Sequence, residues 1–336
     1  MAVQINDIID SIYEQFPQEI RERIEQRKSI VKAKPETITE EDEKWIKEHI
    51  DELFKKGARE MKDPLKFSWQ PHLRHPSLVV SWSADASKLG TKVTDYLNRK
   101  LGGRGFCETE PVEFFPLGGV AIEDDLVQFP ESRFYACPKN DLVVFKGTPP
   151  SYEWYKLLNL ILDVAEQYCH VKELHTIGGM VSLSTHTTPR ELVGTFNSPE
   201  LKKALSHYNL ARGLDYETPP GQRPTLNSFL LWAAKRRNIL GINLLVPIPF
   251  YLAAVDDPKA QRRVLEFFNQ RFGLGIDFSD LDEESKSQNK KIAQVRNSFP
   301  DIDESIRKLE SNLMLSEEES QRLVKEIEKF LREKRG

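Results

Sequence analysis

The sequence predicts an α/β protein, a three-layer α/β/α sandwich around a mostly parallel sheet, with helical extensions at both ends. From about residue 77, segments with strand character alternate with segments with helical periodicity. Such alternation is typical of a parallel sheet covered by helices on both faces. The apolar runs LVVF and INLLV have no polar alternation, as expected for strands that are buried on both faces.

Three regions follow from the pattern. Residues 1–70 form an N-terminal helical extension, residues 71–280 the α/β core and residues 281–336 a charged helical segment. The first region has an apolar stripe at helical spacing, and Pro71 and Pro76 bracket the linker that follows it. In the last region Ser316 and Glu319 form a capping box.

The core elements can be placed in order along the chain. The segments with strand character are SLVVSW, RFYACP, DLVVFKG, ELHTIGG and INLLVPIP. The segments with helical character are KLGTKVTDYLNRKL, SYEWYKLLNLILDVAEQY, TLNSFLLWAAKRRN and PKAQRRVLEFFNQRF. Gly102 and Gly273 are expected to end two of these helices, because glycine adopts the left-handed conformation of a helix C-terminus.

Composition excludes several classes of partner. The chain has 336 residues, 30% charged, and a formal net charge of −4, so no basic excess would attract nucleic acid or an anionic membrane. The most apolar run, residues 239–255, is interrupted by prolines and too short to span a bilayer. Three scattered cysteines indicate reduced thiols, and the N-terminus has no apolar signal core. We expect a cytoplasmic protein.

The stretch ELHTIGGMVSLSTHTTPRELVGT, residues 173–195, concentrates small polar side chains after a strand. Gly178 and Gly179 are interpreted as the exit of that strand. The simpler hypothesis is a structural loop whose hydroxyls satisfy freed backbone groups. The alternative is a polar cleft for an anionic or hydroxylated ligand, in which Ser184, His186 and Thr187 contact the ligand and helix-start amides near Ser151 complete it.

Other chemical motifs are weak. The serines of this stretch do not form a nucleophile elbow, and the sequence has no phosphate-binding loop. Gly275 belongs to a Gly-x-Gly that follows a helix, so it is not a dinucleotide fingerprint. His72 and His75 have no third ligand nearby. We expect neither a metal site nor a cofactor.

Several segments, in order over residues 76–300, resemble the proteasome assembly chaperone 2 family, in particular its bacterial-type members. They are RFYACP with DLVVFKGTPPSYEW, IGGMVSLSTHTTPRELVGTFNSPEL, and the long stretch from YETPPGQRP to FGLGIDFSDL. The resemblance implies an α/β/α fold related to nucleoside phosphorylases and peptidyl hydrolases, and self-association or pairing with a related subunit. It also implies, for the archaeal and eukaryotic members, a role in assembling proteasome rings.

The sequence departs from the family at three points. Relatives commonly read Pro-His-Thr-Arg where this chain has residues 185–188, so His186 and Thr187 match but the arginine does not. Relatives often read Pro-His-Tyr where this chain has Pro249, Phe250 and Tyr251, so the histidine is replaced by phenylalanine and the tyrosine is kept. The chain ends LREKRG, without the hydrophobic–Tyr–any ending of proteasome-binding members.

The functional hypothesis is a non-catalytic assembly chaperone or scaffold, a homo-oligomer with a protein client. The alternative is an enzyme or small-ligand-binding protein, similar to the phosphorylases and hydrolases or to ATP-grasp ligases. It would use a cleft at the carboxyl ends of the strands. The candidate residues of this cleft are Ser151, Gly178, Gly179, Ser184, His186, Thr187 and Tyr251.

Overall fold

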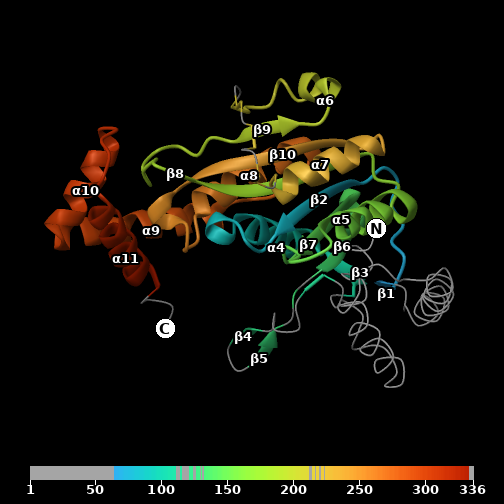
Figure 1. Cartoon of the computed structure of the whole chain (residues 1–336), viewed down its shortest axis with the longest axis horizontal. Coiled ribbons are helices and arrows are strands. Elements are labelled where there is room, and N and C mark those ends of the chain that lie inside the picture. The colour runs from blue at the N-terminus through green and yellow to red at the C-terminus, as the bar shows by residue number, and fades with distance from the viewer. Residues whose placement is uncertain are drawn as a thin grey trace, which may run out of the picture. The chain divides into compact units, whose positions relative to one another are not determined.

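A mixed eight-stranded sheet organises the part of the chain that the computed structural model describes, which comprises residues 64–110, 114–115, 121–123, 126–128, 130, 132–211, 214–215, 217–218, 221–222 and 224–332. The strand order is β1-β3-β6-β7-β2-β8-β10-β9 (Figure 1). The strands are β1 (Leu65–Phe67), β2 (Ser77–Trp82), β3 (Arg104–Thr109), β6 (Ser132–Cys137), β7 (Leu142–Gly147), β8 (Glu173–Ser182), β9 (Val193–Phe196) and β10 (Leu240–Pro249). A separate hairpin pairs β4 (Ala121–Glu123) with β5 (Leu126–Gln128).

The predicted α/β/α class is confirmed, and the parallel pairing is confined to the centre of the sheet. Strands β7, β2, β8 and β10 pair in parallel. The flanking strands β1, β3 and β6 on one side and β9 on the other join by antiparallel pairing. The runs LVVF and INLLV lie in β7 and β10, where side chains are buried on both faces, as the sequence predicts.

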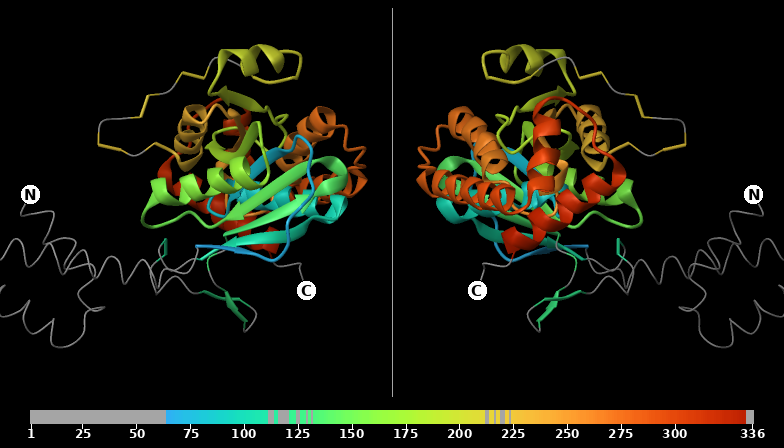
Figure 2. Two further views of the ribbon diagram at one scale, coloured as in Figure 1. Left: turned by 90° about the vertical axis from the view of Figure 1, so that its right-hand side faces the viewer. Right: turned by 90° about the vertical axis from the view of Figure 1, so that its left-hand side faces the viewer.

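Helices cover both faces of this sheet (Figure 2). They are α4 (Leu89–Leu101), α5 (Trp154–Asp163), α6 (Pro199–Ala204), α7 (Leu226–Arg236), α8 (Pro258–Phe272), α9 (Ser279–Ser298), α10 (Pro300–Glu310) and α11 (Glu317–Arg332). One core cluster joins α4, α8 and α9–α11 to side chains such as Val79 and Val144. The other joins α5 and α7 to the alternate residues Val80 and Phe145. The alternation of strand side chains therefore separates the two hydrophobic cores.

Local sequence signals mark the ends of several of these helices at the positions that the sequence predicts. Gly102 and Gly273 follow α4 and α8 with φ of 68° and 61°. Ser316 Oγ accepts from Glu319 N (3.2 Å), and Glu319 Oε2 accepts from Ser316 N (2.8 Å), which confirms the capping box. Helix α5 begins at Trp154 with Glu153 as its N-cap residue, so Ser151 precedes the first helical residue by three positions.

The three-region division remains a prediction. Most of the expected N-terminal helical extension lies outside the described residues. Within its last residues the chain already joins the sheet as β1, although the sequence placed residues 65–67 in the extension. Helices α9–α11 bury Ile292, Ile306 and Leu323 in the same core cluster as α4 and α8. In the described part of the chain, no helix is both long enough and apolar enough to cross a membrane.

Candidate functional site

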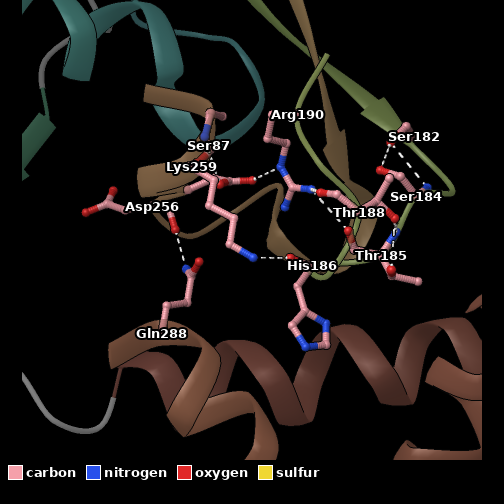
Figure 3. A network of polar contacts seen from close by, with 12 residues as sticks. Ser87, Ser182, Ser184, Thr185, His186, Thr188, Arg190, Asp256, Lys259 and Gln288 are labelled. Carbon is pink, nitrogen blue, oxygen red and sulfur yellow. Dashed lines mark hydrogen bonds and ion pairs between the residues drawn. The ribbon is translucent and has the colours of Figure 1, made fainter. Parts of the chain in front are cut away.

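Polar side chains gather at the carboxyl ends of β8 and β10, in the segment 182–190 that we name the β8 loop. Ser182 Oγ lies 2.6 Å from Ser184 Oγ. Thr185 Oγ1 lies 2.8 Å from Thr187 Oγ1 and 3.0 Å from Thr188 Oγ1 (Figure 3). The hydroxyls of this loop therefore bond mainly to one another, as Ser and Thr side chains do in turns.

His186 and Tyr251 meet at the base of the loop. Tyr251 belongs to the 3₁₀ turn η5 (Phe250–Leu252) that follows β10. Its hydroxyl accepts from His186 N (2.7 Å) and lies 3.0 Å from His186 Nδ1. The hydroxyl keeps its own proton and a second lone pair, so it pairs with Nδ1 in either tautomer of the imidazole. Burial, followed by the charge of Lys259, lowers the pKa of His186 to about 4. The imidazole is therefore neutral at pH 7.

A buried ion pair fixes the same loop to α8. Arg190 Nε lies 2.8 Å from Asp257 Oδ2, and these side chains are 2% and 0% exposed. Arg190 Nη1 donates to the carbonyls of Thr185 (3.1 Å) and Thr188 (2.7 Å). Asp257 Oδ1 also accepts from Ala260 N (3.1 Å) as the N-cap of α8. The ion pair thus satisfies backbone groups of both the loop and the helix.

Lys259 completes the closure of the loop. Its Nζ donates to the His186 carbonyl (2.5 Å), and burial lowers the pKa of this lysine. Figure 3 shows the His186 ring pointing away from Ser182 and Ser184 and towards the C-terminal helices. Four predicted site residues, Ser184, His186, Thr187 and Tyr251, thus lie in the β8 loop or bond to it. Their polar groups hold the loop in place.

The other predicted residues lie elsewhere. Ser151 is exposed and follows β7, and its backbone N donates to Phe114 O (2.9 Å). The sequence interpretation placed the exit of the strand at Gly178 and Gly179, but β8 continues to Ser182. A Cβ at Gly179 would lie 2.3 Å from Ala86 O, so the glycine permits a close approach of the β2–α4 connection.

Sequence analysis missed a second polar region, which we name the β2–β8 junction. Strand β2 pairs with β8 only as far as Val80 and Thr176, whereas β10 follows β8 to Ser182. Beyond Thr176, two side chains bond to the β8 backbone in place of β2. Asp85 Oδ2 accepts from Gly179 N (2.9 Å), and Asn227 Nδ2 donates to Ile177 O (3.1 Å).

This junction is the topological switch point of the sheet. The chain leaves β2 through α4 on one face and leaves β8 towards α7 on the other face. In open α/β sheets the crevice between two such strands is the usual place for a ligand. Here the chain's own backbone enters that crevice, because Ala86 packs against Gly179.

Asp85 is a carboxyl with a raised pKa beyond the carboxyl end of β2. Its Oδ2 also accepts from Gly90 N (3.0 Å), while Oδ1 is buried and has no hydrogen-bond partner. Burial raises its pKa to about 6, against the lowering effect of the two N–H donors. A carboxyl with that pKa can exchange a proton near neutral pH. The sequence signal was Asp85 three residues after the strand SLVVSW, in a stretch that resembles an ordinary loop.

Asn227 of α7 ties the same junction to side chains on the face of the sheet that α5 and α7 cover. Its Oδ1 accepts from Trp82 Nε1 (2.9 Å), and its Nδ2 also approaches Asn243 Oδ1 (3.2 Å). Asn243 Oδ1 in turn accepts from Thr176 Oγ1 (2.9 Å). Across the described residues, no group of three His, Cys, Asp or Glu side chains could hold a metal ion.

Comparison with known proteins gives a family and a fold. The model of the PAC2 family matches residues 80–296. A PAC2 family protein from Streptomyces avermitilis is 19% identical, with a TM-score of 0.57 over 65% of this chain and 95% of that one. No curated protein sequence matches the chain significantly.

Two further solved structures have the same fold. A proteasome-assembly chaperone homologue from Mycobacterium tuberculosis is 16% identical and has a TM-score of 0.55 over 65% of this chain and 94% of that one. PbaB from Pyrococcus furiosus, an archaeal proteasome activator, is 20% identical and has a TM-score of 0.57 over 69% of this chain and 98% of that one.

Proposed function

The chain belongs to the PAC2 family, and from that premise we propose that it is a non-catalytic protein-binding member, an assembly chaperone or scaffold. Its client is another protein, and the chain acts as a homo-oligomer in the cytoplasm. Two proteins of the same fold are described as a proteasome-assembly chaperone homologue and as a proteasome activator. The proposed class of activity is taken from these two descriptions, and a proteasome is one candidate client.

The observation that carries this proposal is how the polar groups of the β8 loop are used. His186, Tyr251, Arg190, Asp257 and Lys259 bond to one another or to the loop backbone. A catalytic base needs a lone pair that faces the substrate. The Nδ1 atom of His186 is instead engaged by the Tyr251 hydroxyl, 3.0 Å away. This arrangement favours a structural role for the loop.

One observation favours the alternative, a small-ligand site. Asp85 has a buried Oδ1 without a hydrogen-bond partner and lies at the switch point where α/β sheets bind ligands. A ligand there would have to displace the Ala86 backbone from Gly179. This requirement makes the junction the weaker candidate.

A pair of experiments separates the two functions. For the alternative, thermal unfolding of the full chain is followed with a panel of nucleotides, nucleosides and amino acids. A ligand at a hundred times its Kd would add about 2.7 kcal/mol to the stability of the fold. We expect no compound to do so. A shift that disappears in both His186→Ala and Asp85→Asn would establish a ligand site and overturn the proposal.

For the proposed role, the affinity-tagged chain is used to identify a partner, and the complex is then rebuilt from the two purified proteins. We expect a complex of fixed stoichiometry in sedimentation velocity, which His186→Ala leaves intact if that variant keeps its fold. Failure of every enriched protein to form such a complex would contradict the protein-binding role.

A further inference from the structure

The outer edge of the sheet beside β9 opens into a groove of about 540 Å³. It lies between β9, α6 and the end of α7, at the top of Figure 1. Its apolar side chains come from β9, α6 and the segment that follows α6, and two lysines complete the lining. These residues are Phe196, Leu205, Leu210, Leu214, Lys202 and Lys235. The groove is separate from the β8 loop and from the β2–β8 junction.

The backbone of β9 offers unpaired groups to this groove. Asn197 N donates to Gly241 O (3.0 Å), so the backbone groups of residue 197 point towards β10. Because neighbouring residues of a strand point in opposite directions, the backbone groups of Phe196 point away from β10. At the start of the strand Ala211 covers this edge through a bridge to Val193. Near Phe196 the described residues provide no such cover.

The charges of the groove have one sign. Lys202 and Lys235 are exposed, and no Asp or Glu is among the described residues that line the groove. Glu200 of α6 accepts a hydrogen bond from Ser198 Oγ (2.7 Å), and Lys235 helps to lower its pKa. A cationic groove on a chain with a net charge of −4 is a local exception. Its charge complements carboxylates.

We propose that this groove binds an extended peptide segment of a partner protein, with alternating apolar and acidic side chains, which adds to the edge of β9 as a further strand. Strand addition supplies affinity through main-chain hydrogen bonds, and side-chain pockets supply specificity. Here apolar side chains enter between Phe196, Leu205 and Leu210, and carboxylates reach the lysines. The inference rests on the protein-binding role proposed above and names the chemistry of the partner segment.

The test uses the full chain and a fluorescein-labelled octapeptide, Gly-Gly-Val-Glu-Val-Glu-Val-Glu, followed by fluorescence anisotropy at low salt. We expect saturable binding that weakens as salt is added, because screening reduces the attraction between lysine and glutamate. Two matched peptides isolate the two contributions. Replacing each Glu by Lys should abolish binding, and N-methylating each valine and glutamate should weaken it at least tenfold, since the peptide then has no N–H to donate.

Protein variants locate the site. Lys202→Glu combined with Lys235→Glu should weaken binding of the octapeptide at least tenfold. The control combines Lys286→Glu with Lys290→Glu on α9, which changes the net charge equally at two exposed lysines outside the groove. All four positions are exposed, so both variants should unfold at the temperature of the parent. Equal loss in both variants, equal binding of the N-methylated peptide, or no binding at millimolar concentration would overturn the proposal.

The outcome is separable from that of the proposed function. If a client complex forms and persists in the Lys202→Glu and Lys235→Glu variant, and the octapeptide does not bind, the groove proposal fails while the protein-binding role stands. If the octapeptide binds as expected but no client complex can be rebuilt, the groove is a peptide site and the assembly role fails.

Discussion

The β8 loop and the β2–β8 junction are two polar regions at the carboxyl ends of the central strands, and their charged side chains have different partners. In the loop, Arg190 and Asp257 face each other as a buried ion pair. At the junction, Asp85 accepts two backbone hydrogen bonds, and among the described residues it has no cationic partner and its Oδ1 has no hydrogen-bond partner. Paired charges fix a structure, whereas an unpaired buried carboxyl responds to pH.

The two regions also differ in the sign of their pH dependence. The pKa of His186 is lowered from 6.5 to about 4, so its contribution to stability is present above pH 6.5 and is lost as the pH falls towards 4. The pKa of Asp85 is raised from 3.8 to about 6, so its contribution is present below pH 3.8 and is lost as the pH rises to 6. Between pH 4 and 6 the two effects oppose each other.

The largest expected effect comes from breaking the ion pair of the β8 loop. Arg190→Met removes the cation and leaves Asp257 buried and uncompensated, which should lower the free energy of unfolding by about 3–5 kcal/mol. Urea denaturation measures the loss. The control is Arg322→Met, which removes a surface pair with Asp301 whose side chains are 60% and 42% exposed and should change stability by about 1 kcal/mol or less. Similar losses in the two variants would mean that the buried pair does not fix the loop.

At the junction, removal of the charge should have the opposite consequence. Asp85→Asn keeps an oxygen that can accept from Gly90 and Gly179 but cannot ionise. The free energy of unfolding of the variant should therefore rise, relative to that of the parent, by about 2 kcal/mol between pH 4 and pH 7, with most of the change below pH 6.

Denaturation curves at a series of pH values test this prediction. Glu283→Gln is the control, because it removes a carboxylate at an exposed position of α9. A difference between Asp85→Asn and the parent that does not change with pH would show that the Asp85 carboxyl titrates as it would in the unfolded chain.

Much of the fold was predictable because its signals are local. Continuous apolar runs identified the central strands, and Gly102 and Gly273 marked helix ends. The missed strands β3 and β9 have the sequences RGFCET and VGTF, whose charged or glycine residues do not resemble buried strands. They form because β6 and β10 offer open edges, which is tertiary information that a local pattern does not contain.

The candidate site was predictable only in part, for a related reason. The structure brings His186, Thr187 and Tyr251 into one region, but whether their polar groups face a ligand or one another depends on residues distant in sequence. Tyr251 is 65 positions from His186. Asp85 was missed because its environment is created by the approach of Gly179, which lies 94 positions away. Gly179 itself resembled a strand exit, although the glycine serves a close contact inside the strand.

The smallest expected effect concerns the hydrogen bond between the β8 loop and η5. Tyr251→Phe removes the hydroxyl that pairs with His186 N and Nδ1, which leaves these buried groups without a partner and should lower the free energy of unfolding by about 1–2 kcal/mol. The pKa of His186 should stay well below 6.5, because burial and Lys259 are the main causes of its lowering and neither is removed. NMR titration of the imidazole measures this pKa, and urea denaturation measures the stability. A His186 pKa that returned to about 6.5 would mean that the tyrosine hydroxyl alone keeps the loop closed, in which case the loop could open to admit a ligand and the contrast with the junction would disappear.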